Sequence, residues 1–150
     1  MNAPHFLNVD LEIESEHELA ALEAELASKV CFLAGRRVGT GCFSLCLEIL
    51  PQRRTADDTI LALCALLERL SAKARRAWRS AYKKEFDAGY EAGPPQVVTH
   101  ISFRADTLQR LSKLDATLLV TIYDHSARNL KAPAKSAPVK RKNKRGATKA

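Results

Sequence analysis

Residues 6–13 read Phe-Leu-Asn-Val-Asp-Leu-Glu-Ile, and this stretch decides the expected fold. Apolar and polar side chains alternate along it, with Leu7, Val9, Leu11 and Ile13 on one face. A period of two residues is typical of a strand that buries one face and exposes the other. The sequence therefore predicts a half-buried strand, and the segments that follow must supply the layer that covers it.

A helix is predicted directly after this strand. The segment Ser15-Glu16-His17-Glu18 has the spacing of a capping box, in which the serine hydroxyl accepts from the backbone amide three residues later. Leucines then recur at intervals of three and four, which predicts an amphipathic helix to about Ser28.

Two strands and a second helix are expected next. Val30 to Ala34 and Cys42 to Leu50 are rich in strand formers, and the glycine-rich residues 35–41 between them predict a hairpin turn. In the second segment the apolar side chains share one face, namely Phe43, Leu45, Leu47 and Ile49. Thr55 and the two aspartates that follow supply a cap and favourable charges for a helix from about Asp57.

Residues 69–86 predict a basic amphipathic helix. Arg69 to Lys84 contains seven basic residues and no acidic one, and Trp78, Tyr82 and Phe86 recur at four-residue spacing along one flank. Two interpretations stay open: the aromatic side chains pack on the body while the arginines are solvated, or this face contacts nucleic acid or an acidic protein.

The rest of the body predicts a strand at Val97 to Phe103, a short helix with leucines at 108, 111 and 114, and a final strand at Leu118 to Tyr123. The resulting order is β-α-β-β-α-β-α-β. It predicts an α+β fold, namely a ferredoxin-like β-α-β-β-α-β sandwich extended by one further helix and strand. We expect residues 1–127 to form this single domain.

Residues 128–150 have a different composition. They contain nine of the 24 Lys and Arg residues and none of the 17 Asp and Glu residues. A segment rich in Lys, Arg, Ala and Pro without an apolar run cannot bury enough surface to fold, so we expect a disordered basic tail. Such a polycation attracts DNA or RNA without reading its sequence, because neutralised phosphates release counterions.

The sequence therefore nominates a set of nucleic-acid-binding residues in two segments. The tail would supply most of the affinity, and the basic helix would assist. The set is Lys140, Arg141, Lys142, Lys144 and Arg145 of the tail with Arg75, Arg76 and Arg79 of the helix. The tail cluster would also serve as a nuclear address in a eukaryote or as a contact with an anionic membrane, and a purely solubilising tail is the plainest alternative.

No pattern of residues predicts catalysis, a metal site or a cofactor. Cys42 and Cys46 would lie about 13 Å apart along a strand, and the four histidines are scattered without metal-site spacing. The glycine-rich residues 35–41 lack the Lys-Ser/Thr ending of a phosphate-binding loop, although Arg36 and Arg37 there would be able to meet a phosphate. The sequence thus gives no positive case for an enzyme.

Composition also favours a soluble protein in a reduced cytoplasmic compartment. The four cysteines lie in apolar stretches, the first ten residues lack the features of a signal peptide, and the longest apolar stretch, Ile60 to Leu67, is far short of about 20 residues. We expect no membrane insertion. In a bacterium the basic tail would place the protein with the nucleoid.

Charge is distributed unevenly along the body. Residues 1–28 contain seven acidic side chains and no Lys or Arg, whereas residues 69–84 are basic. Two functions follow as hypotheses: a nucleic-acid-associated accessory protein, or a protein-binding module of the immunity or adaptor kind that uses its charged faces.

Four segments, FLNVDLEIES, TILALCALLERL, AWRSAYKKEFDAGYEAG and LDATLLVTIYD, together resemble an uncharacterised family of small bacterial α/β domains of unknown function. The most specific part is the spacing from Trp78 to Phe86 with the residues that follow it to Tyr90. The resemblance implies a bacterial cytoplasmic origin, and it supplies no activity and no catalytic residue.

Overall fold

The computed structural model describes residues 4–37, 41–93 and 98–124, with the backbone alone for residues 34–37. The fold is α+β, as the sequence predicts. Its strands are β1 (His5–Ser15), β2 (Val30–Arg37), β3 (Phe43–Ile49), β4 (Lys83–Glu91) and β5 (Thr117–Tyr123), and its helices are α1 (Ala20–Leu26), α2 (Ala56–Glu68), α3 (Ala72–Ser80) and α4 (Ala105–Lys113). The basic segment 128–150, for which disorder is predicted, lies outside the described residues.

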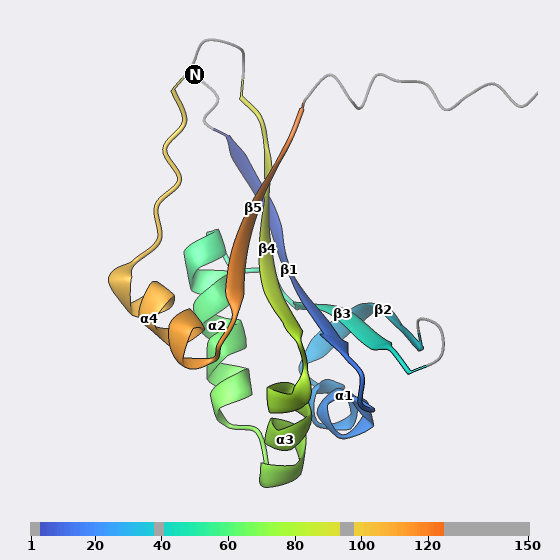
Figure 1. Cartoon of the computed structure of the whole chain (residues 1–150). Helices are drawn as coiled ribbons and strands as arrows, with labels where there is room; N and C mark the ends of the chain where they lie inside the picture. Colours follow the sequence, from blue (N-terminus) through green and yellow to red (C-terminus); the bar gives the residue numbers. More distant parts are fainter. Residues whose placement is uncertain (1–3, 38–40, 94–97, 125–150) are drawn as a thin grey trace, which may run out of the picture.

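The strands form one mixed sheet in the order β2-β3-β1-β4-β5. The central strand β1 pairs antiparallel with both β3 and β4, and β5 adds to β4 in parallel (Figure 1). The alternation predicted for β1 is confirmed, because Val9, Leu11 and Ile13 are fully buried. Leu7 is only half-buried, since the register shifts between Phe6 and Asn8 and changes which side chain faces the core.

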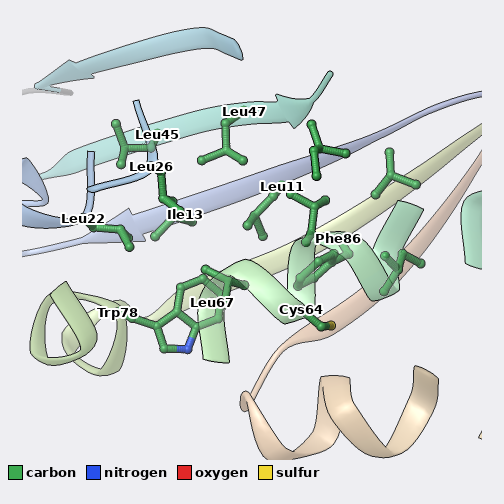
Figure 2. Packing of buried hydrophobic residues seen from close by; sticks show 14 of the residues in the cluster. Leu11, Ile13, Leu22, Leu26, Leu45, Leu47, Cys64, Leu67, Trp78 and Phe86 are labelled. Atoms are coloured by element: carbon green, nitrogen blue, oxygen red, sulfur yellow. The ribbon is translucent and has the colours of Figure 1, made fainter. Parts of the chain in front are cut away.

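The core lies between the sheet and the helices. Figure 2 shows leucines of β3 and β1 and Phe86 of β4 on the sheet side, with Cys64 and Leu67 of α2 opposite them. The predicted cap of α2 is also confirmed, since the Thr55 hydroxyl accepts from the Asp58 amide at 3.1 Å. None of the helices in the described parts of the chain has the length and apolar character needed to cross a membrane.

The predicted basic helix over residues 69–86 is wrong in its second half. Helix α3 ends at Ser80, and the chain enters the sheet as β4, where it pairs along β1. Consequently Trp78, Tyr82 and Phe86 do not form a stripe: Trp78 is buried on α3, Tyr82 is exposed between the two elements, and Phe86 is fully buried in the sheet. The backbone of β1 offers a row of hydrogen-bonding partners, which outweighs the helical propensity of this segment.

Three smaller expectations are also corrected. Residues 98–103 carry no regular secondary structure, so the predicted strand at Val97 to Phe103, with His100 in mid-strand, is wrong for the described part of that segment. The Ser15 hydroxyl accepts from the His17 amide and turns the chain, while α1 begins later, at Ala20. Helix α4 forms where its leucines predict, but Asp106 and Gln109, whose spacing resembles a helix cap, lie inside it, and its N-cap is Arg104, without a side-chain hydrogen bond.

Charged side chains fix the helices to one another. Arg104 binds Asp57 and Asp58 at the start of α2. Arg110 of α4 donates two hydrogen bonds to the carboxylate of Glu68 at the C-terminal end of α2, with nitrogen–oxygen distances of 2.8 and 2.6 Å. Helix α4 is thereby held along α2. These contacts also place the C-terminal end of α4 beside α3, where a cleft opens.

Candidate functional site

The strongest candidate site is a shallow basic cleft of about 400 Å³ where the ends of α2 and α4 meet α3 and the start of β4. Four of the side chains that line it are cationic and two are acidic. The lining residues are Leu67, Glu68, Arg75, Trp78, Arg79, Lys84, Lys113, Leu114 and Asp115. We call it the basic cleft below.

The floor of the basic cleft is a fixed cation. The Lys84 side chain is only 6% exposed, and its Nζ lies 2.9 Å from a carboxylate oxygen of Asp115 and 5.8 Å from the centre of the Trp78 ring. Trp78 is itself held, because its Nε1–H donates to the Leu114 carbonyl at 3.1 Å. The Lys84 ammonium has three N–H donors, and its ion pair with the exposed Asp115 carboxylate uses one of them. The remaining donors can bind a further acceptor.

The rim of the basic cleft carries less constrained cations. Arg75 uses one terminal nitrogen to bind the carbonyls of Leu70 and Glu68, at 2.9 and 3.3 Å, which satisfies the end of α2. Arg79 and Lys113 form no ion pair with any described residue. Glu68 is already engaged by Arg110, whose hydrogen bonds hold the pKa of the Glu68 carboxyl below its ordinary value.

This arrangement suits the binding of an anion. The lining residues supply ammonium and guanidinium donors, which match the oxygens of phosphate or carboxylate groups. Among the residues that the structure describes, no Ser, His or Cys lines the cleft. Trp78 is a wall of the cleft and not a stacking platform, because only 4% of it is exposed.

The structure brings together only part of the set nominated from the sequence. Arg75 and Arg79 lie four residues apart on α3 and both line the basic cleft, whereas Arg76 is exposed and does not line it. The predicted tail residues, Lys140, Arg141, Lys142, Lys144 and Arg145, lie outside the described residues, and so do the side chains of Arg36 and Arg37.

Sequence reasoning missed Lys84 and Lys113 as partners of these arginines. The helix predicted over residues 69–86 includes Lys84, although Phe86, Ala88 and Tyr90 recur at a period of two directly after it, a pattern typical of a strand. No local pattern could have nominated Lys113, because only the packing of α4 along α2 brings it to α3.

A second charged surface covers the face of the sheet that the helices leave open. Cross-strand pairs place Asp10 opposite Asp87 and Glu12 opposite Glu85, and Lys83 lies among them, with its Nζ 2.5 Å from a carboxylate oxygen of Glu12. We call this surface the acidic sheet face; its carboxylates are Asp10, Glu12, Glu14, Glu48, Glu85 and Asp87.

Burial and nearby carboxylates raise the pKa of two groups on the acidic sheet face. Partial burial, and then repulsion from Glu48, Asp87 and Glu12, raise the pKa of Asp10 from 3.8 to about 6. Burial and neighbouring carboxylates likewise raise the pKa of the Cys46 thiol to about 11.

The acidic residues of the N-terminal region do not all belong to this face. Glu25 of α1 accepts from the backbone amide and the hydroxyl of Ser71, at 2.8 and 2.6 Å, and so caps the start of α3. Within the described parts of the chain, no group of three or more His, Cys, Asp or Glu side chains is placed to hold a metal ion.

Comparison with known proteins found no matching family model, no similar curated protein and no similar solved structure. The resemblance to a family of small bacterial domains therefore stays a prediction.

Proposed function

We propose that this protein is a non-enzymatic, nucleic-acid-associated accessory protein that binds DNA or RNA through phosphate contacts, without sequence preference. The observation that carries the proposal is the basic cleft, which Arg75, Arg79 and Lys113 line together with the buried Lys84. The basic segment 128–150 supplies further cations. Cations of this kind contact phosphates and position a nucleic acid but do not read its bases.

Salt dependence provides the test. If five or six phosphates are neutralised, log affinity for duplex DNA should fall with log salt at a slope of about −5. Fluorescence anisotropy of a labelled duplex and a labelled single strand, at several salt concentrations, measures that slope. Replacing the five tail cations at 140–142, 144 and 145 with Gln in the full chain should remove most of it.

The cleft is tested separately from the tail. The double variant Arg79→Ala, Lys113→Ala removes two cations without an ion-pair partner among the described residues, so the slope should become less steep by about 2. The matched control is Lys29→Ala, Arg53→Ala, which removes two exposed cations elsewhere. Equal affinity of the wild type and both the tail and cleft variants would refute the proposal.

A protein-binding function of the immunity or adaptor kind is the second candidate, and the acidic sheet face favours it. Among the described residues this face carries six carboxylates, three of which pair with Lys83, so it is complementary to a cationic partner. The probe is a peptide of residues 135–149 added to the full chain. Salt-sensitive binding that is lost in Asp87→Asn, Glu85→Gln would support this candidate, and failure to bind would count against it.

We also propose that the segment from β1 to β4 is a ferredoxin-like unit, extended by α4 and β5. Its support is the order β4-β1-β3-β2, with every neighbouring pair antiparallel. Helix α3 would then be an insertion before β4. An experimental structure with another strand order would contradict this assignment.

A reducing cytoplasmic location in a bacterium, as the family resemblance implies, is part of the same proposal. The four cysteines are all free, and burial raises the pKa of the Cys64 thiol to about 12. Protein purified without reductant should therefore show all four thiols on titration after denaturation. A lower count would indicate oxidation and contradict the location.

A further inference from the structure

Strand β5 is an edge of the sheet that carries none of the usual protection against pairing with another strand. Its sequence, Thr-Leu-Leu-Val-Thr-Ile-Tyr, contains no Lys, Arg, Asp, Glu, Pro or Gly, and its register with β4 has no bulge. The opposite edge, β2, has a register shift after Phe32 and ends in Gly35-Arg36-Arg37. Such features normally prevent an edge strand from pairing with another chain, and β5 lacks them.

Apolar side chains of β5 are exposed on both faces. The exposed fractions are 37% for Val120 and 57% for Ile122 on the helix side, and 41% for Leu119 and 51% for Tyr123 on the open side. Figure 1 shows β5 at the outside of the sheet. Exposed apolar residues gathered on one edge indicate an interaction surface.

The backbone of β5 is also oriented for pairing. The Ala92 N–H donates to the Tyr123 carbonyl at 2.8 Å, so the polar backbone groups of Tyr123 point toward β4. Orientation alternates along a strand, and the pairing with β4 is regular from Thr117 to Tyr123. The N–H and C=O groups of Leu118, Val120 and Ile122 therefore point outward from the edge.

We propose that β5 pairs antiparallel with β5 of a second copy of this chain, about a twofold axis at Val120, and joins the two sheets into one. In this register Val120 faces Val120 of the second copy, and Leu118 faces Ile122. These are the residues whose backbone groups point outward, so each outward N–H meets a carbonyl of the other copy. No shift of register is needed to satisfy them.

Side-chain chemistry points to a second copy as the occupant. On the helix side, the twofold axis brings Val120 against its own counterpart and Leu118 against Ile122. On the open side it brings Leu119 against Thr121. All these cross-strand pairs are aliphatic or involve threonine, and no like charges meet, because the strand has no charged residue. The strand is thus complementary to itself.

Sedimentation equilibrium of the full chain at 300 mM salt tests the proposal. We expect a reversible monomer–dimer equilibrium between about 5 μM and about 500 μM, the range in which small interfaces associate, and no larger species. A strictly monomeric chain over this range would overturn the proposal, and it would show that the edge is covered by residues of the chain itself or is left unpaired.

A charge-swap pair of variants tests the register. Val120→Lys and Val120→Glu each place two like charges opposite one another at the axis, so each should weaken dimerisation at least tenfold. An equimolar mixture of the two should regain the dimer, because opposite charges then meet. Leu33→Lys, at an exposed position of the β2 edge, is the matched control and should dimerise like the wild type.

Circular dichroism and the Tm verify that each variant is folded. A variant dimer as strong as the wild-type dimer, or a mixture that stays monomeric, would exclude the axis at Val120. The wild-type sedimentation result stands independently of these variants. Since none of the substituted residues lines the basic cleft, anisotropy with DNA distinguishes failure of this proposal from failure of the nucleic-acid proposal.

Discussion

Replacing Asp10 with Asn should stabilise the folded protein at neutral pH. In the folded state, burial and the carboxylates of Glu48, Asp87 and Glu12 oppose ionisation of Asp10. Asparagine keeps the hydrogen bond that Asp10 accepts from the Asn8 amide at 2.9 Å, because its side-chain oxygen is also an acceptor. The substitution therefore removes a repelled charge with little change of shape.

The size and the pH range of this effect follow from the pKa. A pKa of about 6 in place of 3.8 corresponds to roughly 3 kcal/mol. Because Asp10 is only partly buried, solvent screening reduces the expected gain to about 1 kcal/mol. The folded protein holds this proton more tightly than the unfolded chain, so wild-type stability falls as pH rises from about 4 to about 6.

Urea unfolding of the wild type and Asp10→Asn at pH 4, 6 and 7.5 measures the difference directly. The variant should match the wild type near pH 4 and exceed it by about 1 kcal/mol at pH 7.5. Glu16→Gln, which removes an exposed charge away from the acidic sheet face, should show no such rise. An Asp10→Asn variant that is less stable at pH 7.5, or equally shifted at all three pH values, would refute the reasoning.

Three further substitutions test the fold. Leu47→Asp places a carboxylate without a partner at a fully buried position, so it should lower the free energy of unfolding by several kcal/mol and abolish the cooperative transition seen by circular dichroism. A cooperative transition would contradict the register of β3. Thr55→Ala removes the N-cap of α2 and should lower the free energy of unfolding by about 1 kcal/mol in urea; no change would mean that the cap contributes nothing. Trp78→Phe leaves the Leu114 carbonyl without its donor and should cost about 1 to 2 kcal/mol by the same measurement, whereas an unchanged stability would count against the cleft geometry.

The local sequence pattern was sufficient to predict the buried face of an element that has one face against the core and the other in water. Leu11 and Leu47 were placed correctly because a period of two leaves a single choice of buried face. Thr55 was recognised because an N-cap is a local contact between a side chain and an amide three residues later. The Ser15 cap failed because its hydroxyl had a nearer amide, that of His17.

Only half of the cationic residues of the basic cleft could be predicted from the sequence. Arg75 and Arg79 were found because charge and helical spacing are local properties. Lys84 and Lys113 were not, because they come from different elements and approach α3 only through the packing of β4 and α4. The acidic sheet face shows the same limit, since Glu48 and Asp87 join Asp10 through strand pairing alone.

The sequence by itself determined the α+β class, the buried faces of β1 and β3, the start of α2 and the basic composition of α3, because each depends on neighbours within a few residues along the chain. Only the tertiary structure decided that residues 83–91 form a strand beside β1 and that β5 lies at an exposed edge. The physical reason is that a backbone gains its sheet hydrogen bonds from a strand far away in the sequence. Residues that read locally as helix can thus become strand when such a partner is present.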